Sequence, residues 1–568
     1  MAVSMADAGD VLSAEADDHF HDECGVFGIF GRQDAAAIVT LGLHALQHRG
    51  QEAAGIVSYD GSQFHVERHV GLIGDTFTKQ RVIDSLQGNR AIGHTRYATT
   101  GGAGLRNIQP FFAELSEGGL AVAHNGNLTN ALTVQRALQK QGSIFSSTSD
   151  TETLLHLVAT SKERDLNSRF IDAVRQVEGA FSLVAMTAKK MIGCRDPLGI
   201  RPLVLGDLDG AWILASETCA LDIIGARFVR DIKPGEMVVI TSKGIESLFP
   251  FEPQKTRFCI FEYVYFARPD SSVEGRNVYE VRKRIGAELA QENPVEADIV
   301  VPVPDSGTPA AIGFSQAAGI PFELGIIRNH YVGRTFIQPG DSIRHMGVKL
   351  KHNANRRMIE GKRVVLVDDS IVRGTTSQKI VQMVRDAGAR EVHMRIASPP
   401  TSASCFYGVD TPEKSKLLAS RMSVEEMAEF IRVDSLGFLS IDGLYRAVGE
   451  PLQWDQRLRM EPRELERLLA SPATHIHVLR VDGEAAGLCE FNGVGQSVVE
   501  LTHFGLVPAF QGRRLGPFLL DRSLRAVWSY RPERLWLHTD TYDHPNAQPV
   551  YRRAGFKAYA EQMETLPD

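Results

Sequence analysis

KRVVLVDDSIVRGTTS, residues 362–377, gives the clearest indication of fold in this chain. Its first half is a run of branched apolar residues, which is typical of a strand buried on both faces of a sheet. Two carboxylates, Asp368 and Asp369, end the run, and a loop from Ser370 to Thr376 then opens a helix. Backbone N–H groups and hydroxyls at a helix N-terminus can cradle phosphate, and paired carboxylates suit ribose hydroxyls or Mg²⁺. The stretch therefore predicts a phosphate-binding turn at the end of a parallel strand.

The surrounding sequence, from 255 to 443, predicts the rest of that sheet. Continuous apolar strands alternate here with helical patterns, which indicates an α/β domain whose parallel sheet is covered on both faces. The strand segments are ADIVVPVP, KRVVLVDDS and EVHMRIAS, and the helical segments are GTPAAIGFSQAAG and TSQKIVQMVRDAG. A long, basic segment at 328–351 interrupts the alternation, and a segment of this kind is usually functional or disordered.

The turn and its strand resemble the 5-phosphoribosyl-1-pyrophosphate (PRPP) motif of type I phosphoribosyltransferases. The resemblance implies that PRPP is bound by Asp368, Asp369, Ser370, Arg373, Gly374, Thr375 and Thr376. It also implies that Ser306, in VPVPDSGTP, lies near Mg²⁺ together with the two aspartates, although a simple strand–helix turn is the alternative. Arg334 and Lys349 of the basic segment would then close over the pyrophosphate; the alternative is a solvated charged face.

Residues 24–254 follow a different rhythm. Short β-type runs broken by glycine, such as CGVFGIFG and LAVAHNGNL, alternate with a few helical patterns. This pattern predicts an α+β domain with packed antiparallel sheets.

The segment HDECGVFGIF at 21–30 places Cys24 between an acidic leader and an apolar run. A buried strand cysteine is one interpretation. The other is that residues 1–23 are a propeptide, removed by self-cleavage, so that Cys24 becomes the first residue. Its own α-amine, with a pKa of about 8, could then act as the base for a thiol with a pKa of about 8.5.

Four further segments favour the second interpretation: LQHRGQEAAG, HTRYATTGG, AHNGNL and SSTSDTE. Together with Cys24 they resemble the N-terminal-nucleophile glutamine amidotransferases, which implies an N-terminal-nucleophile hydrolase sandwich. Arg96 would hold the glutamine carboxylate, and Asn125 with the Gly126 N–H would form an oxyanion hole. Asp150 would hold the substrate ammonium, or cap the helix that follows it.

The two blocks in one chain resemble the glutamine phosphoribosylpyrophosphate amidotransferases, or amidophosphoribosyltransferases. The resemblance implies that glutamine, PRPP and water yield 5-phosphoribosylamine, glutamate and pyrophosphate, the first step of purine synthesis. It also implies Mg²⁺, a homo-oligomer (dimer or tetramer) and inhibition by purine nucleotides.

One branch of that family carries a structural 4Fe-4S cluster on four cysteines. Cys259 and Cys405 stand where two of the ligands belong, but a CxxC pair for the other two is absent from the sequence. Two thiolates cannot hold a cluster that needs four, so we expect the cluster to be lost.

Residues 444–568 are predicted to form a third, smaller α/β unit. This unit resembles part of the GCN5-related N-acetyltransferase fold, in the segments VELTHFGLVPAFQGRRLGPFLL and NAQPVYRRAGF. The resemblance implies acetyl-CoA binding by Gln511, Gly512, Arg514, Gly516 and Tyr551, with Arg514 in place of a glycine. A helix rich in surface arginine is the alternative, and the acceptor substrate cannot be read.

The composition sets outer limits. The chain has 568 residues, enough for three or four domains, and a net charge of −7, which argues against a general nucleic-acid or membrane-surface binder. Six scattered cysteines and the lack of a secretory signal favour a reducing cytoplasm. Two alternatives to the amidotransferase stay open: an acetyltransferase with a degenerate amidotransferase half, and a non-catalytic PRPP-binding regulator.

Overall fold

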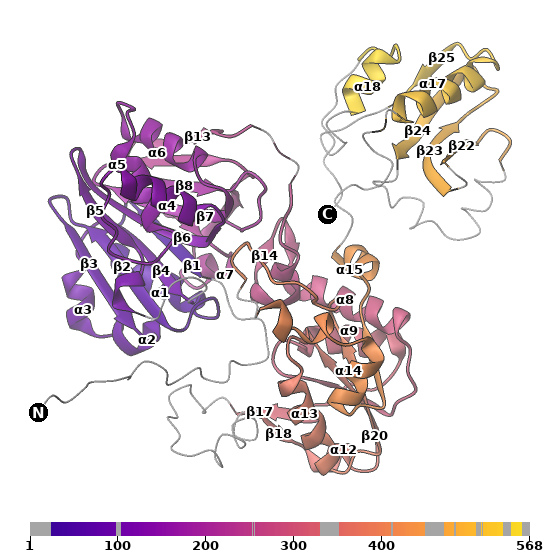
Figure 1. Ribbon diagram of the computed structural model, residues 1–568, viewed down its shortest axis with the longest axis horizontal. Helices are drawn as coiled ribbons and strands as arrows, with labels where there is room; N and C mark the ends of the chain where they lie inside the picture. The colour runs from indigo at the N-terminus through magenta and orange to yellow at the C-terminus, as the bar shows by residue number, and fades with distance from the viewer. Residues whose placement is uncertain are drawn as a thin grey trace, which may run out of the picture. The chain divides into compact units, whose positions relative to one another are not determined.

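The computed structural model describes residues 24–97, 104–252, 254, 256–329, 352–409, 413–448, 471–481, 484–506, 513, 515–537 and 547–558. The chain divides into two compact units, Met1–Val448 and Gly449–Asp568. The first unit contains both the glycine-broken block and the parallel-sheet block (Figure 1). In the described residues no helix is long and apolar enough to cross a membrane.

Residues 24–254, the predicted glutamine amidotransferase domain, are called the glutaminase half below. This half is built on two antiparallel sheets, as predicted. One has the order β11-β9-β10-β1-β4-β2-β3. Its strands are β1 (Gly25–Phe30), β2 (Ala53–Tyr59), β3 (Phe64–Val70), β4 (Arg90–Arg96), β9 (Val204–Leu208), β10 (Ala211–Ala215) and β11 (Arg227–Asp231). The other has the order β13-β12-β8-β7-β6-β5. Its strands are β5 (Phe111–Leu115), β6 (Gly118–Leu128), β7 (Gly179–Thr187), β8 (Met191–Arg195), β12 (Met237–Thr241) and β13 (Gly244–Leu248).

Helices cover the outer faces of this sandwich (Figure 1). They are α1 (Ala35–Ala45), α2 (Ile73–Thr76), α3 (Gln80–Ser85), α4 (Ala131–Lys140), α5 (Glu152–Thr160), α6 (Leu166–Arg175) and α7 (Cys219–Asp222), with a 3₁₀ turn η1 (Leu105–Asn107). The two sheets meet over an apolar layer that includes Val26, Ile92 and Val184. Gly28 makes their close approach possible, because a Cβ there would lie 2.8 Å from Val184 Cγ1.

The second half of this unit contains the predicted parallel sheet, with the order β16-β19-β20-β21. Its strands are β16 (Ile299–Pro302), β19 (Arg363–Asp368), β20 (Glu391–Ile396) and β21 (Ser435–Phe438), and two short ribbons pair β14 (Ser272–Val273) with β15 (Arg276–Asn277) and β17 (Ile326–Arg328) with β18 (His352–Ala354). The helices are the π-helix η2 (Glu262–Phe266), α8 (Val278–Glu292), α9 (Thr308–Ala318), α12 (Arg356–Ile359), α13 (Thr375–Asp386), α14 (Val424–Ile431) and α15 (Ile441–Val448), with 3₁₀ turns η3 (Lys414–Lys416) and η4 (Leu418–Ser420). Separate apolar cores lie on the two faces of the sheet, which explains why its strands are apolar throughout.

Helix α15 spans the domain boundary expected at 443/444. It packs on α8, where Arg446 pairs with Glu288 and Glu292 and Arg284 donates to the carbonyl of Ala447. These contacts hold the chain to the parallel-sheet half as far as Val448.

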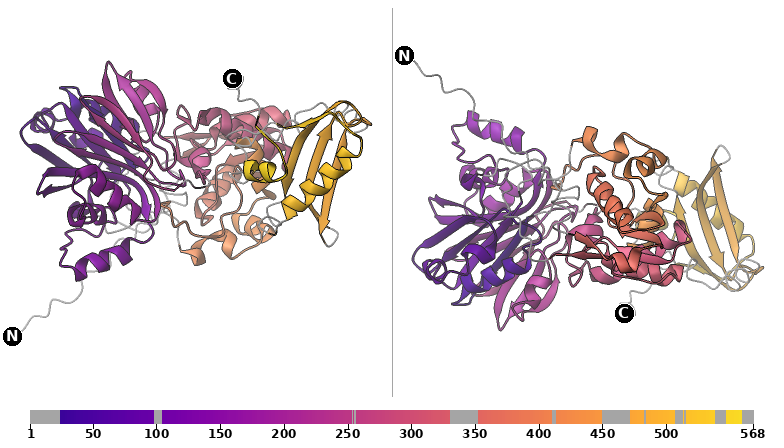
Figure 2. Two further views of the ribbon diagram at one scale, coloured as in Figure 1. Left: turned by 90° about the horizontal axis from the view of Figure 1, so that it is seen from above. Right: turned by 90° about the horizontal axis from the view of Figure 1, so that it is seen from below.

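The second compact unit is a four-stranded sheet with the order β22-β23-β24-β25. Its elements are β22 (His475–Val481), β23 (Glu484–Asn492), β24 (Val498–Leu506), α17 (Leu515–Trp528), β25 (Arg534–Trp536) and α18 (Ala547–Arg553). Figure 2 shows α17 lying across one face of this sheet, where Leu520 and Val527 join Phe491 in an apolar core.

The two halves of the first unit are joined by a buried cation. The Arg49 guanidinium is fully buried and binds the carboxylates of Glu217, which follows β10, and Glu262, the first residue of η2. Burial alone would raise the pKa of Glu217, but the charges of Arg49 and His48 hold that pKa well below its usual value. Arg49 therefore provides one positive charge that contacts a buried carboxylate from each half.

We expect Arg49→Ala to destabilise the first unit severely, because it removes the cation that contacts both buried carboxylates. The expected loss in the free energy of unfolding is about 3–5 kcal/mol, measured by urea unfolding at pH 7. Arg32→Ala is the matched control, since Arg32 pairs with Asp34 and Asp209 at the surface, and it should cost about 0.2–1 kcal/mol. Equal effects of the two substitutions would contradict this account of the interface.

Candidate active sites

Cys24 lies directly before β1, a central strand paired with both β4 and β10. Its thiol donates a hydrogen bond to the carbonyl of Tyr97 at 3.5 Å. Burial raises the pKa of this thiol to about 11, opposed by the Tyr97 bond and by the charge of Arg96. In a chain that keeps residues 1–23, the Cys24 nitrogen is a peptide nitrogen and cannot act as a base.

Arg96 and Asp150 lie within electrostatic reach of Cys24, since the first lowers and the second raises the pKa of its thiol. Arg96 ends β4 and is largely buried, and its neighbour Thr95 pairs with Gly25 of β1. The structure thus brings together the nucleophile and the two residues predicted to hold the α-carboxylate and α-ammonium of glutamine.

The predicted oxyanion residues lie together on β6. Asn125 is fully buried, and neither of its side-chain polar atoms has a hydrogen-bond partner in the described part of the chain. Gly126 has φ +138°, and a Cβ there would lie 2.0 Å from the carbonyl oxygen of Ala180, so no other residue fits. A buried amide with an unused N–H is an uncommon and costly feature, and a developing oxyanion is a group that it could stabilise.

Asp150 is tied to the same strand. Its carboxylate accepts hydrogen bonds from the Leu128 N–H at 2.9 Å and from the Thr151 hydroxyl at 3.2 Å. Helix α5 begins one residue beyond Thr151, so the aspartate sits between the helix and the oxyanion strand. This position fits the predicted ammonium-binding role.

A supporting network around His124 was missed by sequence reasoning. The His124 N–H donates to Gln109 at 2.7 Å, and the Thr151 hydroxyl bonds both the Gln109 amide and His124 Nδ1. Burial lowers the pKa of His124, which keeps the ring neutral beside Asp150. The sequence does show His124 directly before Asn125. The hydrogen-bond partners of His124, Gln109 and Thr151, come from other parts of the chain.

The phosphoribosyl site lies at the carboxyl edge of the parallel sheet. Strands β16 and β19 run side by side, so the turn with Ser306 and the turn with Asp368 and Asp369 open at the same edge. Gly374, with φ +79°, begins α13, which gives the predicted loop-to-helix cradle.

The acidic pair fits a hard cation. Asp369 is buried, its Oδ1 accepts the Ser370 hydroxyl at 2.5 Å, and its Oδ2 has no hydrogen-bond partner among the described residues. A buried carboxylate oxygen left for a ligand is the donor that Mg²⁺ prefers.

The basic segment starts and ends beside this edge. Its two flanks pair as the ribbon β17–β18, and Arg328 binds Asp305 next to Ser306 at 2.5 Å. Arg334 and Lys349 themselves lie outside the described residues, as do the leader 1–23 and, in the second unit, Gln511, Gly512 and Arg514.

Two predicted acetyl-CoA residues are described in the second unit. Gly516 lies in the first turn of α17, and Tyr551 lies on α18. Tyr551 is largely buried and packs against Phe504 and Phe556, with ring centroids 6.0 and 6.2 Å apart.

The cysteines do not fit a 4Fe-4S cluster. Cys259 and Cys405 lie near each other, since Cys405 adds to the effect of burial in raising the pKa of Cys259. Cys194 and Cys219 are buried in the two cores of the glutaminase half, and the sixth cysteine, Cys489, lies in the second unit. Cys259 and Cys405 thus provide two thiolates, whereas a 4Fe-4S cluster requires four.

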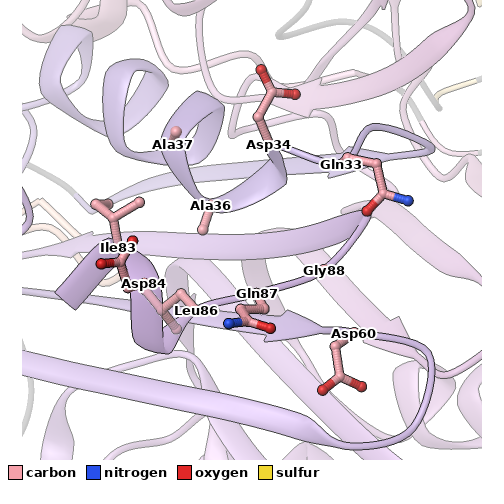
Figure 3. Close-up of a pocket in the computed structure, with 10 residues that line it drawn as sticks. All are labelled: Gln33, Asp34, Ala36, Ala37, Asp60, Ile83, Asp84, Leu86, Gln87 and Gly88. Carbon is pink, nitrogen blue, oxygen red and sulfur yellow. The ribbon is translucent and has the colours of Figure 1, made fainter. Parts of the chain in front are cut away.

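A separate cavity of about 410 Å³ opens beside the N-terminus of α1 (Figure 3). None of the predicted site residues lines it. Asp60, on its rim, already accepts hydrogen bonds from Ser62, Gln63 and His65. The cavity takes no part in either site.

The two sites define a glutamine amidotransferase joined to a phosphoribosyltransferase, and comparisons with known proteins agree. Residues 94–222 match the glutamine amidotransferase domain family, residues 274–398 the phosphoribosyl transferase domain family, and residues 441–556 the acetyltransferase (GNAT) family. The amidophosphoribosyltransferase of Rhizobium etli is 63% identical over 438 residues, covering 76% of this chain and 88% of that protein. The amidophosphoribosyltransferase of Bacillus subtilis is 49% identical over 431 residues, covering 76% and 90%.

A solved structure described as the allosteric regulatory enzyme of purine biosynthesis matches with a TM-score of 0.73 and 48% identity, covering 76% of this chain and 92% of that one. The glutamine PRPP amidotransferase of B. subtilis complexed with ADP and GMP matches with a TM-score of 0.72 and 48% identity, covering 76% and 94%. The chain therefore belongs to the amidophosphoribosyltransferase family, the enzymes of the first step of purine biosynthesis, and carries an additional acetyltransferase-family domain.

The raised pKa of Cys24 predicts how its thiol reacts. In protein that retains residues 1–23, alkylation of Cys24 by iodoacetamide should be slow at pH 7 and accelerate toward pH 11, because the thiolate is the nucleophile. Peptide mass spectrometry of timed samples measures the rate, and buried Cys194 should stay unlabelled at the same pH values. Rapid labelling of Cys24 at pH 7 in that form would show that the thiol is already activated.

Proposed function

We propose that this chain makes 5-phosphoribosylamine, glutamate and pyrophosphate from glutamine, PRPP and water. The observation that carries the proposal is the buried Asn125, whose side-chain amide has no hydrogen-bond partner among the described residues. It lies in one compact unit with Cys24 and with the acidic turn at Asp368 and Asp369. The reaction itself is inferred from membership of the family. The residues named here have the chemical groups that each half of that reaction needs.

In the glutaminase half, the Cys24 thiolate attacks the amide carbon of glutamine. The C–O π electrons move to oxygen, and the oxyanion is held by the Asn125 side-chain amide and the Gly126 N–H. The α-amine of Cys24 takes the proton from the thiol before the attack. When the intermediate collapses, the amine gives this proton to the leaving nitrogen, which departs as ammonia. Water then hydrolyses the thioester and releases glutamate, while Arg96 and Asp150 hold the α-carboxylate and α-ammonium throughout.

In the synthetase half, the loop from Ser370 to Thr376 and the start of α13 bind phosphate through backbone N–H groups and hydroxyls. Asp368, Asp369 and Ser306 would hold Mg²⁺, which neutralises charge on the pyrophosphate when it is bound. Ammonia displaces pyrophosphate at C1 of the ribose. Arg334 and Lys349 are proposed to cover the leaving pyrophosphate and exclude water.

Ammonia is protonated in bulk water, so it must pass from Cys24 to the phosphoribosyl site without entering solvent. The continuous packing of both halves around Arg49 supports such a protected transfer.

Inhibition by purine nucleotides is part of the proposal. Its support is the relative that was solved with ADP and GMP. A homo-oligomeric state, dimer or tetramer, and a cytoplasmic location are proposed with it on the family resemblance.

Acetyl transfer from acetyl-CoA is proposed as a second activity, on the acetyltransferase family match at 441–556. Gln511, Gly512, Arg514 and Gly516 would bind the pyrophosphate of the cofactor, and Tyr551 would protonate the CoA thiolate. The acceptor is left open. Against an acetyltransferase with a degenerate amidotransferase half stands the intact set around Cys24, Arg96, Asn125 and Asp150.

The first prediction of this function concerns the N-terminus. Intact-mass measurement of the purified protein should show the loss of residues 1–23, with Cys24 as the first residue. An active enzyme that retains the leader would contradict the role of the Cys24 amine.

Two substitutions separate the half-reactions. Cys24→Ser should abolish product formation from glutamine but leave formation from free ammonia, because the phosphoribosyl site is untouched. Asp369→Asn should lower both rates, since it removes charge from the cation site. The assay is PRPP-dependent release of pyrophosphate with either nitrogen source; equal loss of both rates in Cys24→Ser would refute the division of roles.

A further inference from the structure

We propose that the segment Cys405–Val409 of the phosphoribosyltransferase half positions the oxyanion donors of the glutaminase half, and that it links them to the phosphate loop. This inference rests on the proposed function and names residues that the two half-reactions alone do not require. The segment follows β20 and reaches across the junction to β6.

The first contact is with the oxyanion strand. The Asn127 side-chain amide donates to the carbonyl of Phe406 at 2.8 Å. Gly408 has φ +104°, and a Cβ there would lie 3.0 Å from the carbonyl carbon of Gly126 and 3.2 Å from its Cα. The backbone of Gly408 therefore rests directly against the residue whose N–H is proposed to bind the oxyanion.

A buried cation fixes the segment. Arg201 is fully buried, and its Nε and Nη2 donate to the carbonyl of Tyr407 at 3.2 and 2.5 Å. Its Nη1 lies 3.6 Å from Glu262, the carboxylate that Arg49 also binds. The segment is thus fastened to the ion network that joins the two halves.

The other end of the segment touches the phosphate loop. Val409 is largely buried in a small apolar cluster with Val372, Phe266 and Leu417. Val372 lies inside the loop from Ser370 to Gly374, so the apolar cluster connects this loop to Val409, and the adjacent Gly408 rests against Gly126. Close-packed groups cannot move independently, so a shift of the phosphate loop on binding PRPP would reach Gly126 through these contacts.

The same segment begins with Cys405, one of the two cysteines left from the cluster set. With too few thiolates for a cluster, the position of the segment in this chain depends on Arg201, Asn127 and Val409.

Gly408→Ala tests the positioning role. A methyl group at Gly408 must push Gly126, so the turnover number for glutamate release should fall about tenfold to a hundredfold. The KM for glutamine should change by less than about threefold, because the substitution keeps Arg96 and Asp150, which are proposed to hold the α-carboxylate and α-ammonium of glutamine. Ammonia-dependent synthesis should stay within about twofold of wild type. Gly142→Ala is the matched control, since Gly142 has φ +100° but open space around it.

Three results would overturn the positioning role: an unchanged glutaminase turnover number in Gly408→Ala, a rise in KM alone, or the same loss in Gly142→Ala. The ammonia-dependent rate reports whether the variant is folded. If wild-type protein makes no 5-phosphoribosylamine from either nitrogen source, the proposed function itself fails, which is a distinct outcome.

Val409→Ala tests the link to the phosphate loop. It removes two methyl groups from the contact with Val372, so the ratio of glutamate release with PRPP to that without should fall toward one. Val384→Ala shortens a buried valine in a different apolar core of the same half and should keep the wild-type ratio. A wild-type ratio of one, or an unchanged ratio in Val409→Ala, would overturn the link.

Discussion

The guanidinium of Arg49 is buried between the two halves of the first unit and binds a carboxylate from each. Arg49 comes from the turn after α1, Glu217 from the turn after β10, and Glu262 from the start of η2 in the parallel-sheet half. Taking three charges out of water is unfavourable unless each finds its partner, so the geometry of this cluster leaves little freedom to the elements that carry it. The cluster thereby helps to fix the half that contains Cys24 against the half that contains the acidic turn.

Candidate site residues that lie close together in the sequence could be predicted from it. The acidic pair at Asp368 and Asp369 follows its strand and precedes its helix within a few residues, so spacing alone places the carboxylates at the sheet edge. Asn125 and Gly126 are likewise adjacent, and the constraint on Gly126 arises from the neighbouring strand β7. The alternation of apolar strands and helices also gave the parallel sheet, because strands buried on both faces contain few polar residues.

Contacts that join distant segments could not be predicted. Nothing near Arg201 indicates that it binds the carbonyl of Tyr407, 206 residues away. The network of Gln109, His124 and Thr151 is hidden for the same reason, since neutral side chains with small local signals meet only in the folded sheet. Sequence motifs therefore predicted the reacting groups, whereas the residues that contact those groups from distant segments emerged only from the tertiary structure.

The position of Cys24 has a consequence for maturation. Gly25 is already paired with Thr95, the next five residues of β1 continue the ladder with β4, and the last four of them also pair with β10. The bond before Cys24 lies just outside that ladder, so its cleavage breaks no strand pairing. The new amino group would arise on a residue whose position the central sheet has already set. The proposed cleavage would thus act at the edge of a sheet that has already formed, and it would convert the amide nitrogen of Cys24 into a free amine.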